Sequence, residues 1–209
     1  MRFKICFLFC IVSYPILSQS FNIDASIATD TENNLFLYNI APGIGHSFLK
    51  SDYLYGGFKF QSYSLISRAD RDENDFWSTN NILNFMVFGG WRYNQHLFRF
   101  NRGEDNEHIV GIYPDGRFYF NPYLPRSIKY VDDIGSEIKQ TGDYATQFAY
   151  GVGVGVFFKQ TQNNAYFSVK FEYSNIDAFA TLRNLEYGNK HFNFPQTEQY
   201  SIGISIFFQ

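Results

Sequence analysis

Residues 198–209 alternate between bulky apolar side chains and side chains that are mostly small or polar. One face carries Tyr200, Ile202, Ile204, Ile206 and Phe208. The other face carries Ser201, Gly203, Ser205 and Phe207. A period of two indicates a β-strand whose two faces meet different surroundings. Because serine and glycine are too small or too polar to build a dry core, the pattern favours a barrel with an apolar outside and a polar inside.

The N-terminus has the features of a secretory signal. Arg2 and Lys4 precede an apolar stretch at 5–17, and Ser18 and Ser20 put small residues at the −3 and −1 positions. The apolar stretch is shorter than the roughly 20 residues that a membrane-spanning helix needs. We therefore expect residues 1–20 to be removed as a signal peptide and residues 21–209 to form one barrel domain.

Export would remove both cysteines, Cys6 and Cys10, so neither a disulfide framework nor thiolate chemistry is available to the mature chain. Loss of Arg2 and Lys4 lowers the basic count from 17 to 15 against 20 acidic residues, which gives a net charge of −5. A nucleic-acid-binding protein normally carries a basic stripe, and the sequence shows none. Nucleic acid is therefore not an expected partner.

Aromatic residues make up 21% of the chain, yet the mean hydropathy is only −0.26. No segment after residue 20 stays apolar for the roughly 18 residues that mark a transmembrane helix, so a helical membrane protein is excluded. Many aromatic residues at modest mean hydropathy suit a transmembrane barrel, in which only alternate residues meet lipid.

Two segments before the C-terminus repeat the alternation. In 144–158 the small face carries Gly151, Gly153 and Gly155, which would weaken a soluble sheet. In a narrow barrel these glycines leave room for long side chains from opposite strands. In 165–175 Lys170 and Glu172 take the inner face, because a charge that faces lipid is costly.

Three earlier segments, 35–48, 53–65 and 82–93, alternate in the same way and put Lys59 and Arg92 on the inner face. Charges buried inside a barrel must be paired. The sequence therefore predicts a lumen network of Lys59, Arg92, Lys170 and Glu172, which would plug a barrel of eight strands.

Turns expected at 49–52, 94–96 and 159–164 alternate with longer charged segments at 67–79, 102–142 and 176–196. Transmembrane barrels have short periplasmic turns and long extracellular loops. Pro114-Asp115-Gly116 is a turn signal that splits 109–123 into either a hairpin above the membrane or two further wall strands. The fold class we predict is all-β: a transmembrane antiparallel up-and-down barrel of eight strands with long extracellular loops. Ten strands are the alternative, which the absence of alternation in 126–142 disfavours.

The segment Asn39-Ile-Ala-Pro-Gly-Ile-Gly-His-Ser-Phe48, followed by Leu54-Tyr-Gly-Gly-Phe58, resembles the outer-membrane β-barrel domain family. These small porin-like proteins of Gram-negative bacteria share an extended Pro-x-Ile-Gly-x-Phe hairpin. Residues 148–175 resemble a second such hairpin, and 200–208 resemble the terminal strand of the family. The resemblance implies a location in the bacterial outer membrane, with its lipid as a partner. It also implies recognition by the barrel-assembly machinery, for which Phe208 is the assembly signal.

The remaining residues give little support to catalysis. His46, His96, His108 and His191 have no metal-binding spacing, and the acidic cluster at 70–75 lacks the spacing of an EF-hand. His108 and His191 fall beside acids in expected external loops, where a hydrolase site is conceivable, but such residues are common without catalysis. We predict no catalytic, cofactor-binding or metal-binding residues, no cofactor and no enzymatic activity.

Two functions from different classes stay open. The first is a structural or surface-interaction barrel that presents its extracellular loops to a surface ligand that the sequence does not identify. The second is a narrow porin that passes small solutes, and strand number separates the two, since eight strands leave almost no channel. A soluble lipocalin-like barrel would need an apolar inner face, where this chain mostly has glycine, serine, lysine and glutamine.

Overall fold

The computed structural model describes residues 19–30, 36–47, 49, 51–67, 77–101, 107–121, 126–131, 137–142, 147–162, 165–178, 180, 186–187, 190–191 and 196–208. Its strands are β1 (Gln19–Asp30), β2 (Phe36–Ser47), β3 (Asp52–Ser67), β4 (Trp77–Tyr93), β5 (Gln95–Asn101), β6 (Glu107–Asn121), β7 (Arg126–Val131), β8 (Glu137–Gly142), β9 (Gln147–Gln160), β10 (Ala165–Ser174), β11 (Glu186–Tyr187), β12 (Lys190–His191) and β13 (Gln199–Phe208). Among these residues no helix is long and apolar enough to cross a membrane.

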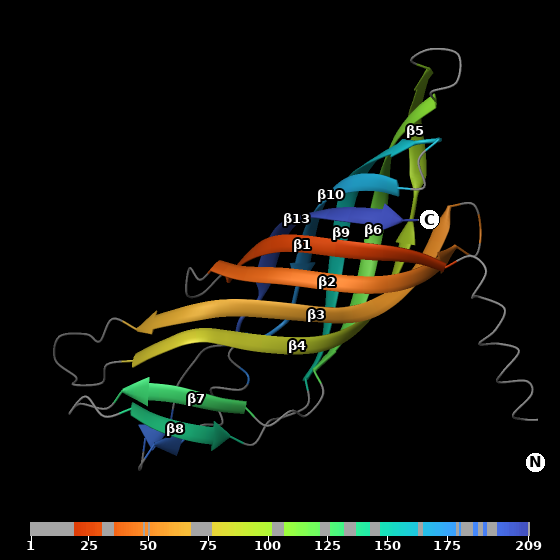
Figure 1. The fold of residues 1–209 in the computed structure, drawn as a ribbon. Coiled ribbons are helices and arrows are strands. Elements are labelled where there is room, and N and C mark those ends of the chain that lie inside the picture. The colour runs from red at the N-terminus through yellow and green to blue at the C-terminus, as the bar shows by residue number, and fades with distance from the viewer. Residues whose placement is uncertain are drawn as a thin grey trace, which may run out of the picture.

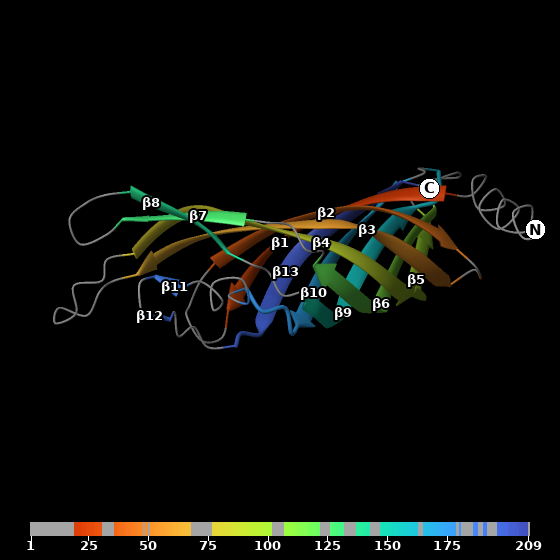
Figure 2. The same ribbon diagram turned by 90° about the horizontal axis from the view of Figure 1, so that it is seen from below.

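Eight strands close into an antiparallel barrel. The pairing runs β1–β2–β3–β4–β6–β9–β10–β13 and returns to β1. Figures 1 and 2 show these strands strongly tilted and wrapped around a common interior. The predicted fold class, an antiparallel barrel of eight strands, is confirmed.

Between β4 and β9 the chain differs from the prediction. Strands β4 and β5 both run antiparallel to β6, so they follow one course along it, interrupted at Asn94. The turn expected at 94–96 is therefore wrong, and the chain reverses between Asn101 and Glu107 instead. The hairpin expected around Pro114-Asp115-Gly116 is also wrong, because β6 runs straight through these residues.

Pro114 is tolerated inside β6 for a local reason. The β4–β6 pairs end at Arg92↔Asp115, and the β5–β6 pairs begin at Gln95↔Ile112. Pro114 therefore lies opposite the interruption in the neighbouring strand, where β6 loses no ladder partner on that side. Proline occurs in sheets at such irregular positions because it has no N–H to donate.

The two ends of the barrel differ. At one, called here the turn end, lie the start of β1, the end of β13 and the short connections β2–β3, β5–β6 and β9–β10. At the opposite end, called the loop end, β1, β3 and β6 end and β2, β4 and β9 begin. The small hairpins β7–β8 and β11–β12 lie at this end (Figure 1). The expected external loop 102–142 is thus corrected: 107–121 is wall, and β5 ends and β6 begins at the turn end.

The barrel has apolar residues on its outer face and polar residues on its inner face, the reverse of a soluble barrel. Phe36, Ile40, Phe148, Val152, Phe171 and Ile204 point outward and are exposed, as the alternation predicted. The inward face buries charged and amide side chains instead, among them Asp24, Gln61, Arg92 and Arg117. A soluble protein rarely leaves so continuous an apolar surface uncovered.

The glycines of β9 make room for long side chains inside the barrel, as predicted. A Cβ at Gly155 would meet the ring of Tyr113, and a Cβ at Gly151 would lie 3.1 Å from the ring of Tyr119 and 3.3 Å from Glu172. Both tyrosines belong to β6, which pairs directly with β9. The room is therefore used by a neighbouring strand, whereas the sequence suggested opposite strands.

Residues 1–18, most of the expected signal peptide, lie outside the described residues. Strand β1 begins at Gln19, two residues before the expected mature N-terminus, with the pairs Gln19↔His46 and Ser20↔Gly45.

Candidate functional site

The structure places all four residues of the expected lumen network inside the barrel. Lys59 comes from β3, Arg92 from β4, and Lys170 and Glu172 from β10. Each side chain is at least nine-tenths buried. They reach the interior because they occupy the inner positions of strands whose outer positions are apolar.

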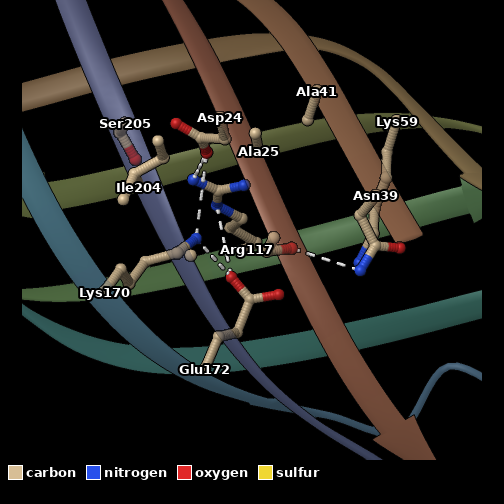
Figure 3. Close-up of a pocket in the computed structure, with 12 residues that line it drawn as sticks. Asp24, Ala25, Asn39, Ala41, Lys59, Arg117, Lys170, Glu172, Ile204 and Ser205 are labelled. Atoms are coloured by element: carbon tan, nitrogen blue, oxygen red, sulfur yellow. Dashed lines mark hydrogen bonds and ion pairs between the residues drawn. The ribbon is translucent and has the colours of Figure 1, made fainter. Parts of the chain in front are cut away.

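The centre of the cluster is Arg117, which the sequence did not single out. Its guanidinium pairs with Asp24 on β1, with Asp115 at 3.3 Å, and with Glu172 on β10 at 3.6 Å. Its Nε also donates to the hydroxyl of Tyr55 at 2.7 Å. In Figure 3 the side chains of Arg117, Asp24 and Glu172 converge from three different strands. One arginine therefore ties together strands from three parts of the wall.

Lys170 supplies a second set of ion pairs to the same acids. Its Nζ lies 2.5 Å from Glu172, 3.4 Å from Asp115 and 3.8 Å from Asp24. The hydroxyl of Tyr119 donates to Glu172 at 2.5 Å, and that of Tyr55 donates to Asp115. The acids thus receive charge-assisted hydrogen bonds, the strongest kind available in a protein interior.

Lys59 and Arg92 lie against aromatic rings. The Nζ of Lys59 is 4.7 Å from the centroid of the Tyr119 ring. The guanidinium of Arg92 lies between the rings of Tyr113, at 3.9 Å, and Phe207, at 4.2 Å, and reaches Asp115 at 3.4 Å. Contacts between a cation and a ring face are favourable, and more so when water is excluded.

Layers of a different character flank the charges. Towards the turn end the interior is aromatic, with the rings of Tyr166 and Phe207 stacked at 4.5 Å. Towards the loop end lies an amide layer, in which Gln61 bonds Asn39 at 2.9 Å and Gln199 at 2.8 Å.

The loop-end mouth is covered by the chain that follows β10. The hydroxyl of Tyr63 donates to the carbonyl of Ala178 at 2.5 Å, and Gln199 donates to the carbonyl of Ile176 at 3.0 Å. Ile176 and Ala178 are almost fully buried. This segment therefore closes the interior above the amide layer.

Little space is left among the charges. The cavity bordered by Asp24, Lys59, Arg117, Lys170 and Glu172 measures about 10 Å³ (Figure 3), which is the room that about one water molecule needs. Four cations face three anions in the cluster, a formal balance of +1. The arrangement can hold strands together by charge, but it offers no space for a substrate.

Asp24, Asp115 and Arg117 were missed for different reasons. Asp24 stands in a readable alternation, since 21–27 place Phe21 and Ile23 outward around Asn22 and Asp24 inward. Asp115 and Arg117 were hidden by the turn signal at 114–116, which broke the alternation of β6 into two pieces. Buried residues on both sides of that signal, from Ile109 to Tyr119, keep one parity and could have revealed the strand.

Phe208 ends β13 on the outer wall, exposed and paired with Phe21 of β1 and Ala165 of β10. Its ring stacks on that of Phe21 at 6.3 Å. The residue therefore lies at the turn end, beside the seam where the first and last strands meet.

The histidines are not gathered into a metal site in the described part of the chain. No group of three or more histidine, cysteine or acidic side chains there could hold a metal ion. His108 corrects its expected place in an external loop: it lies on β6 at the turn end, stacked on Phe100 at 5.2 Å and on Phe158 at 5.4 Å. The acidic cluster at 70–75 lies outside the described residues.

No protein-family model matches the sequence, and no curated protein matches it either. Among solved structures the chain is similar to Neisserial surface protein A, at 12% identity over 91% of this chain and 94% of that chain, with a TM-score of 0.48. It is also similar to Ail of Yersinia pestis, at 12% identity over 91% and 96% with a TM-score of 0.38. A third is the N-terminal β-barrel domain of Pseudomonas aeruginosa OprF, at 11% identity over 91% and 98% with a TM-score of 0.35.

We predict that Arg117→Leu destabilises the barrel far more than Arg99→Leu. Arg117 is buried among three acids, and removing it takes from each of them one of its ion-pair partners, a loss of about 3–5 kcal/mol. Arg99 makes an exposed pair with Glu107 at 3.7 Å, and such pairs contribute about 0–1 kcal/mol. Urea unfolding of the refolded variants measures both losses, and equal losses would contradict the central role of Arg117.

Proposed function

We propose that this protein is an integral barrel of the bacterial outer membrane, exported by its N-terminal signal, with a structural or surface-interaction role and no catalysis. The observation that carries the proposal is the inverted distribution of side chains: apolar residues face out around the wall, and paired charges fill the inside. Lipid is the solvent that suits this outer surface, because the lipid tails are apolar and the closed wall already satisfies its own backbone hydrogen bonds.

The filled interior supports a structural or surface-interaction role over conduction. The charge cluster leaves about 10 Å³ of free space, and Ile176 and Ala178 cover the loop-end mouth. A solute would have to break several buried ion pairs to pass. These features favour the structural or surface-interaction role over the porin alternative.

Interaction with a partner outside the cell is assigned to the loop end. The hairpins β7–β8 and β11–β12 lie there (Figure 2), within the segments that join β6 to β9 and β10 to β13. Connecting segments that a rigid scaffold holds are the usual carriers of recognition. The expected partners are outer-membrane lipid along the wall and a surface ligand at these loops.

We predict that the refolded protein gives no discrete conductance steps in planar bilayers, because the charge cluster leaves no continuous channel. Heat-modifiable gel mobility of the same sample shows that the barrel is folded. Reproducible single-channel steps from the folded protein would favour the narrow porin instead.

The second part of the proposal concerns assembly. Phe208 combines a lipid-facing position at the end of the last strand with the terminal aromatic residue that the family resemblance associates with the barrel-assembly machinery. We predict that Phe208→Ala reduces the amount of barrel that reaches the outer membrane several-fold. Refolding in detergent should survive, because the wall keeps its continuous backbone hydrogen bonding.

The matched control is Phe167→Ala. Phe167 is a lipid-facing phenylalanine of β10 with 43% of its surface exposed, against 46% for Phe208. Immunoblots of outer-membrane fractions compare insertion, and gel mobility compares refolding. Equal insertion of both variants would remove the signal role, and failure of Phe208→Ala to refold would make Phe208 a structural residue.

A further inference from the structure

Strand β5 pairs on one side only among the described residues. It forms a ladder with β6, from Gln95↔Ile112 to Asn101↔Glu107, and no other described strand pairs with it. On its other side β3 begins at Asp52, paired with Tyr93, just before β5 starts. A seven-residue strand edge therefore continues past the end of its neighbour, as Figure 1 shows at the protruding tip of the turn end.

The position beside β5 has the shape of a vacant wall strand. The chain turns from β2 into β3 at this level, where the N–H of Asn94 donates to the carbonyl of Ser51 at 2.7 Å. An added strand would continue the curved wall beyond that turn. Because the slot lies along the wall itself, a slender extended chain fits it, whereas the bulk of a second barrel would meet the β2–β3 turn.

The edge of β5 is protected only in part, because the strand has a register shift between His96 and Phe98 but mostly uncharged side chains. All of its seven residues are exposed, and Leu97, Phe98 and Phe100 expose 48%, 67% and 46% of their surface. Free edges are commonly protected by charged residues or proline. Here the one Lys or Arg residue of the strand, Arg99, already pairs with Glu107.

A cavity opens at the turn end next to this edge. It measures about 150 Å³ and is bordered by Asn94, by His96 of β5 and by aromatic residues of the interior. Polar side chains also line it: Ser47, Lys159 and Thr161. The ring of His96 meets that of the buried Phe157 at 5.8 Å. An apolar cavity of about 150 Å³ holds benzene. This cavity has a similar volume with aromatic and polar walls, so it has room for a single aromatic side chain.

We propose that β5 is a docking strand for an extended segment of a periplasmic polypeptide, one apolar side chain of which enters the cavity beside His96. Main-chain hydrogen bonds to the free edge provide affinity, and the cavity selects the side chain, as in other cases of strand addition. The proposal rests on the proposed function in one respect, that the turn end faces the periplasm. It adds a second interaction surface, opposite the extracellular loops.

The test uses a synthetic peptide of alternating threonine and valine with a central phenylalanine and a terminal cysteine blocked by thiopyridine. In the full-length chain with Cys6 and Cys10 replaced by serine, a Leu97→Cys thiolate attacks the peptide disulfide, forms a protein–peptide disulfide and releases thiopyridone. Two further peptides carry N-methyl groups on alternate amides, one on the odd-numbered and the other on the even-numbered amides. One of the two therefore loses the N–H donors that face β5. The control is Leu49→Cys, an exposed leucine (68%) in the β2–β3 turn.

At Leu97→Cys we expect the unmodified peptide to react roughly tenfold faster than one of the two N-methylated peptides, the one that has lost the donors facing β5. At Leu49→Cys we expect the unmodified peptide and both N-methylated peptides to react at the same rate. The same rate for all peptides at Leu97→Cys would overturn the proposal. Barrel-to-barrel disulfides that form without peptide, and faster for Leu97→Cys than for Leu49→Cys, would assign the edge to a second copy and also overturn it.

Two parallel measurements separate these failures from a failure of the proposed function. Heat-modifiable mobility shows that each variant is a folded barrel. A membrane-impermeant maleimide should label Leu97→Cys in cells only after the outer membrane is permeabilised. Labelling of intact cells would place β5 outside the cell and would overturn the periplasmic partner.

Discussion

Ten residue pairs join β1 to β13, from Phe21↔Phe208 to Asp30↔Gln199, and they turn a curved sheet into a closed wall. Closure pairs the backbone of the first strand with that of the last, so neither strand has a free edge along the seam. That condition allows a sheet to exist in lipid, where an unpaired N–H or C=O has no water to bind. It also creates an interior that is sealed from the outside of the wall.

The charge cluster depends on this closure. Asp24 lies on β1, next to the seam, while Lys170 and Glu172 lie on β10, which reaches β1 only through β13. Arg117 comes from β6 on another part of the wall and pairs with all these acids at once. Because a buried charge without its partner is strongly destabilising, the cluster favours the register that brings its members together. The strand register of the wall and the pairing of the interior charges therefore depend on each other.

Much of this architecture could be predicted from alternation alone. The inner position of Lys59, Arg92, Lys170 and Glu172 follows from the parity of strands whose outer residues are bulky and apolar. The alternation did not predict the strand at 107–121, because a local turn signal interrupted the pattern there. Pro114-Asp115-Gly116 has the composition of a turn, but Pro114 falls in the gap between the β4–β6 and β5–β6 pairs, so β6 continues and carries Asp115 and Arg117 inward. Which charges meet across the interior could not be predicted, because that depends on the register around the whole barrel.

The central claim is that the outer wall faces lipid and the inner wall does not. Phe157 and Phe158 are consecutive residues of β9, one buried at 3% exposure and the other exposed at 43%. In a variant whose native tryptophans, Trp77 and Trp91, are replaced by phenylalanine, a single tryptophan is introduced by Phe157→Trp or by Phe158→Trp. Fluorescence in bilayers of acyl-brominated lipid then reports contact with lipid. We expect strong quenching for Phe158→Trp and little for Phe157→Trp, and equal or reversed quenching would contradict the account.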